Sequence, residues 1–188
     1  MTGGIQLEPE AQAFAEAAAK APLLFTLGPE RGRVALDEVQ SDPVSKPPVD
    51  IEELTIANGP SAQVALRILR PENTHTPLPV IVYIHGAGWM FGSKQTHDRL
   101  MRELAVRAGA VVVFPEYRLC PEARYPTAIE ECYSVVKWVA ERGREHRMDP
   151  ERLAVAGDSV GGNMTAAVTL LSRERGDRTS GSNCCSTR

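Results

Sequence analysis

The sequence has little that would suit it to a nucleic acid or a lipid bilayer. Its 188 residues carry a formal net charge of −3, so the chain has no excess of basic residues for phosphate backbones. No stretch is long and apolar enough to span a membrane, and the N-terminus lacks the pattern of a signal peptide. We therefore expect a cytoplasmic protein with no nucleic-acid partner and no membrane span.

Cysteine is also scarce, and its spacing does not suit a metal site. None of the cysteines belongs to a C-x-x-C pair accompanied by a second pair or by histidines; they are Cys120, Cys132, Cys184 and Cys185. We therefore expect no bound metal and, in a cytoplasmic protein, free thiols. The remaining composition, 43% hydrophobic and 24% charged, is typical of a soluble globular domain.

Residues 1–48 differ from the rest of the chain. Helices are predicted at residues 8–20, where Pro9 suits a first turn, and at residues 29–40. The prolines that follow favour an extended link up to residue 48. We predict that residues 1–48 form a helical cap segment, and the alternative is that these helices simply pack on the body.

The body, residues 49–175, alternates strands and helices. Strands are predicted at 49–57, 64–70, 80–84, 110–114 and 153–156, and the last three are continuous apolar runs typical of strands buried on both faces. Helices are predicted at 96–108, 128–142 and 160–173, with a turn or short capped helix at 149–151. This order predicts an α/β fold with a mostly parallel sheet, an antiparallel start and helices on both faces.

One pentapeptide indicates nucleophilic catalysis. Residues 157–161 read G-D-S-V-G, which matches G-x-S-x-G, and they lie directly between a predicted strand and a predicted helix. A sharp strand-to-helix turn lets a serine hydroxyl project clear of the backbone towards a base. Main chain approaches closely at such a turn, so Gly157 and Gly161 leave no room for a side chain. We predict that Ser159 is the nucleophile and that Asp158 supports the motif.

A second motif, H-G-A-G-W at residues 85–89, follows the apolar strand at 80–84. Acyl transfer needs backbone N–H donors for the oxyanion that forms at the attacked carbonyl, and a loop of small residues can turn such groups into a site. We predict that the donors are Gly86, Ala87 and Val160. We assign the loop's scaffold to the other members of the motif, His85, Gly88 and Trp89. Trp89 and Phe91 either line an acyl pocket or merely pack.

A third motif, Y-R-L-C-P-E at residues 117–122, completes a resemblance. In this order and spacing the three motifs resemble those of the hormone-sensitive-lipase-like group of α/β-hydrolase carboxylesterases, whose usual forms are HGGGW, YRLAPE and GDSAGGN. The resemblance spans residues 8–175, with departures at Ala87, Cys120 and Val160. It implies hydrolysis of short-to-medium acyl esters of small molecules without a cofactor. It also implies structural roles for Arg118 and Glu122.

The sequence lacks the rest of a catalytic triad. In α/β-hydrolases the order is Ser, then Asp or Glu, then His. Every histidine of this chain precedes Ser159. The carboxylates that follow include Glu174 and Asp177, and Asp177 comes too soon after the last predicted helix to be the triad acid. We therefore expect a truncated α/β-hydrolase core without its C-terminal strands. We also expect the chain as given to be inactive or nearly so.

Residues 176–188 have no apolar periodicity where the resemblance implies a further strand. We predict an aberrant, disordered tail. Shifting the frame of a back-translated tail by two bases produces a strand-like sequence, so a frameshift is our hypothesis and a polar flexible terminus is the alternative. Without later strands, residues 153–156 become an exposed apolar sheet edge, which predicts self-association.

Three functions remain open at this point. The first is a serine carboxylesterase, the second is a non-catalytic small-molecule-binding protein on the same scaffold, and the third is an amidase or peptidase that uses the same turn. The presence of both the serine motif (residues 157–161) and the donor loop (residues 85–89) favours hydrolysis, because a binding protein need not keep both.

Overall fold

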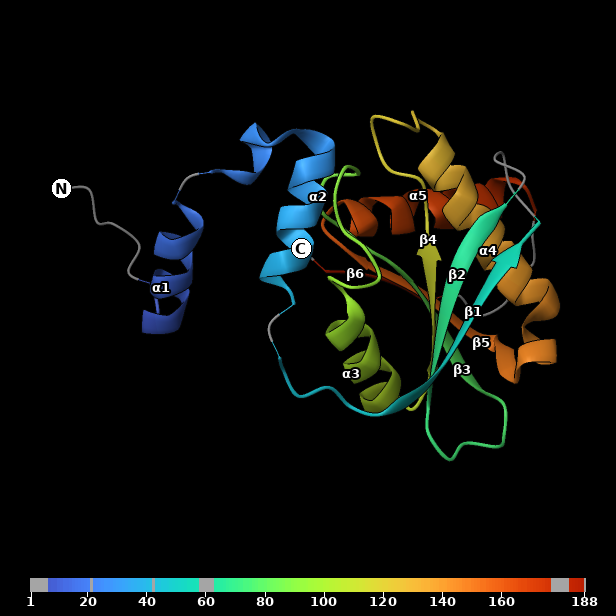
Figure 1. The fold of residues 1–188 in the computed structure, drawn as a ribbon. Helices are drawn as coiled ribbons and strands as arrows, with labels where there is room; N and C mark the ends of the chain where they lie inside the picture. The colour runs from blue at the N-terminus through green and yellow to red at the C-terminus, as the bar shows by residue number, and fades with distance from the viewer. Residues whose placement is uncertain (1–6, 21, 42, 58–62, 177–182, 188) are drawn as a thin grey trace.

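A six-stranded sheet organises the body of the protein (Figure 1). The structure is a computed structural model, and it describes the chain except for residues 1–6, 21, 42, 58–62, 177–182 and 188. The strands are β1 (Val49–Ile56), β2 (Val64–Pro71), β3 (Leu78–Ile84), β4 (Val111–Glu116), β5 (Met148–Asp158) and β6 (Asn183–Thr187). They lie in the order β1-β2-β4-β3-β5-β6.

Strand β2 runs antiparallel to the other strands of the sheet. β1 pairs with β2, and β2 with β4, in antiparallel fashion, so that Val49 lies opposite Pro71 and Ala65 opposite Glu116. From β4 onward, through β3 and β5 to β6, every pairing is parallel. The predicted mostly parallel sheet with an antiparallel start is confirmed.

Helices cover both faces of this sheet. α3 (Asp98–Ala108) packs on one face against β2 and β4, while α4 (Thr127–Arg142) and α5 (Val160–Glu174) cover the other (Figure 1). Successive strand side chains point to opposite faces. Val80 and Val82 therefore belong to the core under α4 and α5, whereas Tyr83 belongs to the core under α3. This two-sided burial explains the continuous apolar runs.

Both helices expected before the body are present, but they differ in their packing. α1 (Pro9–Ala18) has no buried residue and lies apart from the sheet in Figure 1. α2 (Gly28–Val39) packs on the body, beside the loop that follows β3, where Arg33 donates to the carbonyl of Met90. Whether residues 1–48 act as a cap over a site stays a prediction.

The C-terminal residues differ from the sequence-based prediction. Residues 183–187 form β6, which pairs in parallel with β5 so that Ala154 lies opposite Asn183. The prediction of a disordered tail is wrong for these five residues, and residues 177–182 and 188 lie outside the part that the structure describes. A polar segment can join a sheet because the ladder bonds connect main-chain groups. Because β6 pairs with β5, residues 153–156 are not the edge of the sheet, and self-association through a sheet edge stays a prediction.

β5 also begins earlier than predicted. Residues 149–151 belong to the strand rather than to a turn or a short capped helix, because Leu78 and Pro79 pair with Met148 and Asp149. A register shift between Pro79 and Val80 accommodates the proline-containing start of β5 before pairing resumes at Leu153.

Candidate active site

Ser159 lies at the junction between β5 and α5 in a strained conformation. Its φ is 52° and its ψ is −120°, a combination that costs a non-glycine residue roughly 1–3 kcal/mol and persists only where the surroundings enforce it. A Cβ on Gly157 would lie 2.5 Å from the carbonyl oxygen of Ile84, and one on Gly161 would meet the same oxygen. The close main-chain approach predicted at both glycines is confirmed.

The Ser159 side chain is exposed, and its hydroxyl has no side-chain hydrogen-bond partner among the described residues. Among the residues that the structure describes, no side chain, histidines included, hydrogen-bonds to its Oγ. Its carbonyl accepts from the N–H of Asn163 at 3.2 Å, which begins the first turn of α5. The first N–H groups of a helix have no partner within the helix, so Val160 offers a donor directly beside Ser159.

The H-G-A-G-W loop turns through consecutive left-handed residues. Ala87, Gly88 and Trp89 have φ values of 72°, 69° and 60°. The N–H of Phe91 donates to the carbonyl of Ala87 at 3.1 Å, which closes the turn. Neither Ala87 nor Gly88 uses its own N–H for a hydrogen bond with any residue in the described part of the chain. Two adjacent donors are therefore available.

Gly86 is a correction to the predicted donor set. Its N–H donates to Asp158 Oδ1 at 2.9 Å, and a Cβ at this position would meet Asp158 Oδ2. This N–H therefore holds the loop against the serine turn and is not free for an oxyanion. The N–H of Gly88, a residue predicted to belong to the scaffold, has no partner among the described residues, like that of Ala87. The motif alone could not show where the Asp158 carboxylate points.

Asp158 is the centre of a polar cluster under the turn. Its Oδ1 also accepts from the Tyr83 hydroxyl at 2.8 Å and lies 3.7 Å from His97 Nε2. Burial by itself raises the pKa of the Asp158 carboxyl, but the interactions with His97 and Tyr83 lower it to about 2. Asp158 is thus an anion that fixes the loop through Gly86. Its partners Tyr83 and His97 belong to no motif in the sequence and become apparent only in the folded protein.

His85, predicted to belong to the loop's scaffold, is buried. Its ring is buried, 4.3 Å from the Tyr117 ring and nearly parallel to it, and its Nδ1 lies 3.0 Å from the carbonyl of Gly86. Tyr117 also donates to the His85 carbonyl at 2.9 Å. Burial and the neighbouring His97 lower the pKa of His85 to about 4. The imidazole is therefore a neutral packing group.

Comparison with known proteins identifies this arrangement. A family model described as the alpha/beta hydrolase fold matches residues 81–184. The chain belongs to the α/β-hydrolase family. The hormone-sensitive-lipase-like resemblance inferred from the three motifs is confirmed.

This α/β-hydrolase is similar to several proteins named as esterases. It is 40% identical over 157 residues to carboxylesterase NlhH of Mycobacterium tuberculosis, a match that covers 82% of this chain and 49% of that protein. A thermostable esterase from Pseudomonas putida matches with a TM-score of 0.87 at 41% identity, over 93% of this chain and 56% of that one. A fungal esterase from Rhizomucor miehei gives 0.85 and 40%, with the same coverage, 93% and 56%. The chain spans about half the length of the relatives it matches.

The third motif of this hydrolase anchors two neighbouring elements. Arg118 donates through Nε to the buried Glu131 of α4 at 2.8 Å, and the backbone N–H of Arg118 donates to the same carboxylate at 2.8 Å. Glu122 instead accepts two hydrogen bonds from Arg33 of α2, at 2.9 and 2.8 Å. The structural roles implied for Arg118 and Glu122 therefore correspond to observed contacts.

An apolar pocket of about 330 Å³ lies beside the H-G-A-G-W loop. Its lining includes Gly88 and Trp89 from the loop, Cys120 and Ile129, and Asn163 from the first turn of α5. Trp89 therefore lines a pocket. Phe91 packs against α2 instead, where a Cβ on Gly32 would lie 2.6 Å from its ring.

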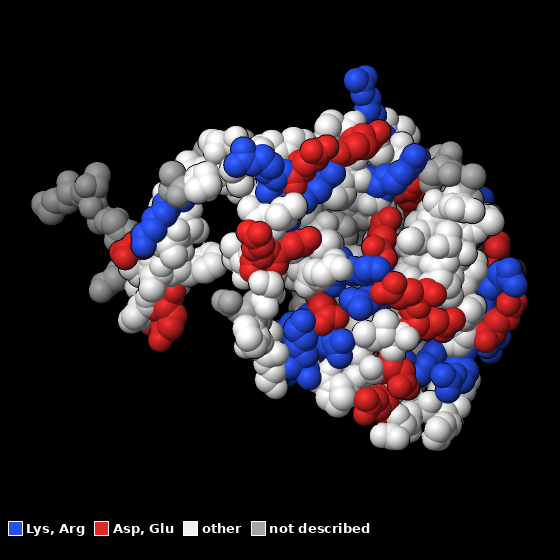
Figure 2. Space-filling model, in the orientation of Figure 1, with Lys and Arg blue, Asp and Glu red and all other residues white. Residues whose placement is uncertain are grey.

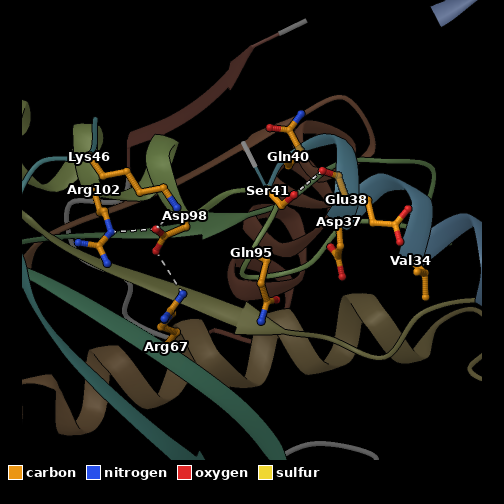
Figure 3. Close-up of a pocket in the computed structure, with 10 residues that line it drawn as sticks. All are labelled: Val34, Asp37, Glu38, Gln40, Ser41, Lys46, Arg67, Gln95, Asp98 and Arg102. Atoms are coloured by element: carbon orange, nitrogen blue, oxygen red, sulfur yellow. Dashed lines mark hydrogen bonds and ion pairs between the residues drawn. The ribbon is translucent and has the colours of Figure 1, made fainter. Parts of the chain in front are cut away.

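A larger pocket, of about 530 Å³, lies away from Ser159 and contains none of the predicted site residues. In Figure 3 its ionic wall is centred on Asp98, which pairs with Lys46 at 2.9 Å, Arg102 at 3.0 Å and Arg67 at 3.3 Å. These contacts join the link before β1, strand β2 and helix α3. We interpret this cluster as structural.

On the face in Figure 2, Lys and Arg are interspersed with Asp and Glu across the body. None of the helices in the described ranges is long and apolar enough to cross a bilayer. Within those same ranges, no three His, Cys, Asp or Glu side chains are grouped as metal ligands would be.

Proposed function

We propose that this chain supplies the nucleophile and the oxyanion donors of a serine carboxylic ester hydrolase. One observation carries the proposal: Ser159 is held in a strained turn, and the loop bonded to that turn contains Ala87 and Gly88, whose N–H groups have no partner among the described residues. The Gly86–Asp158 hydrogen bond makes this connection. The carboxylesterase and esterase names of its relatives agree with the proposal.

In the proposed reaction, Ser159 Oγ attacks the ester carbonyl carbon and loses its proton to a base. The resulting oxyanion accepts hydrogen bonds from Ala87, Gly88 and Val160 N–H, and such preorganised donors stabilise the transition state. Collapse of the intermediate expels the alcohol, which takes up the proton, and leaves an acyl-Ser159 ester. Water then hydrolyses this ester to the carboxylic acid and regenerates the serine.

Neither histidine near the site suits the role of base. His85 is buried and stacked on Tyr117, and His97 lies against Asp158. We therefore propose that the triad acid and histidine are residues that this chain does not contain, and that the chain alone turns over esters negligibly. Loss of a triad member typically costs about 10³–10⁶ in rate.

The apolar pocket suggests the substrate class. Its volume of about 330 Å³ and its apolar lining beside Gly88 and Trp89 suit short-to-medium acyl chains. We propose small uncharged carboxylic esters as substrates, and no step of this reaction needs a cofactor.

A paired experiment tests the function. This chain and a form extended by restoring the shifted frame after codon 176 are compared on p-nitrophenyl acetate and butyrate. We expect turnover in the extended form, its loss in Ser159→Ala, and only slow acylation of Ser159 in the short chain, detected by peptide mass spectrometry. The proposal would be refuted if the extended form with Ser159 intact showed neither ester turnover nor acyl-Ser159.

A non-catalytic small-molecule-binding protein is the second candidate. The observation in its favour is that the pocket is formed while no described residue bonds to Ser159 Oγ. Saturable binding of the ester, together with an extended form that never acylates Ser159, would support it. Anilide substrates in the same assay separate an amidase from an esterase.

A further inference from the structure

Arg33 bonds to two segments of the proposed site from a helix outside the α/β core. It lies on α2, and its Nε donates to the carbonyl of Met90 at 2.9 Å. Its Nη2 donates to the carbonyl of Cys120 at 2.7 Å. Both guanidinium Nη atoms also donate to Glu122, at 2.9 and 2.8 Å. The rigid guanidinium fork of Arg33 therefore connects α2 to residues that lie 57 to 89 positions later in the sequence.

Met90, whose carbonyl accepts from Arg33, directly follows the donor loop at residues 85–89. The near end is held by Asp158, through the N–H of Gly86. Ala87 and Gly88, whose N–H groups are unpartnered within the described chain, lie between these two anchors. Without the Met90 anchor, the loop keeps the Gly86–Asp158 bond and the bond from the Cys120 N–H to the Trp89 carbonyl but loses its bond to α2, so the direction of both donors becomes less defined.

Cys120, whose carbonyl accepts from Arg33, also lines the apolar pocket. Cys120 also donates its N–H to the carbonyl of Trp89 at 2.8 Å, so these two residues of the pocket lining are bonded to each other. Arg33 binds Met90, the residue after Trp89, and Cys120 itself, so it restrains the main chain at one residue of the pocket lining and directly beside another.

The packing of α2 makes this geometry rigid. Gly32 lies directly against the Phe91 ring, and Ser93 Oγ donates to Asp37 at 2.7 Å. The Arg33 side chain is only 26% exposed, and charge-assisted bonds in a fixed fork geometry are among the stronger protein hydrogen bonds.

We propose that Arg33 is a positioning residue, which aligns the Ala87 and Gly88 donors and sets the width of the acyl pocket through its two main-chain bonds. This inference rests on the proposed ester hydrolysis. It makes α2 a functional part of the site, although no α2 side chain touches the reacting atoms.

Two substitutions separate positioning from a simple ion pair. Arg33→Met removes all the hydrogen bonds of the fork, whereas Glu122→Gln removes the charge partner and leaves both main-chain bonds. We expect Arg33→Met to slow acylation of Ser159 by p-nitrophenyl butyrate about tenfold or more, because small misplacements of catalytic groups have effects of this size. The ester concentration at half-saturation should change less than the rate, and Glu122→Gln should stay within about threefold of wild type.

Amide hydrogen exchange gives a readout that does not depend on reaction at Ser159. Peptides covering residues 86–92 should exchange at least about tenfold faster in Arg33→Met and unchanged in Glu122→Gln, while peptides from β3 and β4 should match wild type. Arg33→Lys should lie between them, because one ammonium cannot reproduce the fork, and it serves as the test if Arg33→Met does not fold.

The inference fails if Arg33→Met and Glu122→Gln have equal effects, or if residues 86–92 exchange alike in all variants. Absence of acyl-Ser159 in wild type would count against ester hydrolysis itself. The exchange comparison would then still decide whether Arg33 holds the loop.

Discussion

Replacing Gly161 by alanine tests whether close main-chain contact at the serine turn requires glycine. The residue lies in the first turn of α5, where alanine is intrinsically favoured over glycine by about 1 kcal/mol. The structure opposes this gain, because the new methyl group would meet the Ile84 carbonyl oxygen and lie 2.8 Å from the His85 oxygen. Overlap with main chain costs about 3 kcal/mol, since β3 cannot move without disturbing the sheet.

We therefore expect Gly161→Ala to lower the free energy of unfolding by about 2 kcal/mol. For a chain of this length, that corresponds to a fall of roughly 4–8 °C in Tm, measured by calorimetry or circular dichroism. Gly109→Ala is the matched control. Its φ is +58° and no atom lies within 4 Å of the added Cβ, so only backbone strain of about 1 kcal/mol is expected. A Gly161→Ala variant as stable as wild type would refute the steric argument.

Three further outcomes follow from the burial and charge of individual groups. The folded protein keeps His85 neutral down to about pH 4, whereas the unfolded chain protonates it near pH 6.5, so the free energy of unfolding should fall as the pH drops through this range. In His85→Asn, the difference between the urea unfolding midpoints measured at pH 7 and pH 5 should become smaller. Tyr83→Phe removes a donor to Asp158, so the carboxyl pKa should rise above about 2 in an NMR titration, and an unchanged value contradicts the assignment. Burial, with a smaller effect from Glu131, raises the pKa of the Cys132 thiol. Iodoacetamide at pH 8 should therefore label the partly exposed Cys120 before Cys132, and Cys132 only after unfolding.

The predicted elements that matched the structure are those set by local signals. The apolar runs at 80–84 and 110–114 became buried strands because both faces of the sheet are covered, and a strand buried on both faces must be apolar along its whole length. The G-D-S-V-G turn was placed correctly because strand, tight turn and helix follow one another within a few residues. The polar segment 183–187 was assigned wrongly, since pairing through main-chain groups leaves no mark on the side-chain pattern.

By itself, the sequence determined the fold class, the nucleophile candidate, the glycines around it and the family, because each depends on residue types at short fixed spacings. Only the tertiary structure decided which N–H groups are free. Gly86 and Gly88 are equivalent in the motif, yet the carboxylate of Asp158, 72 residues away, occupies the first and leaves the second. It also revealed Arg33, whose partners are brought together by folding alone. Long-range hydrogen bonds depend on where side chains point in space, and no local pattern encodes that.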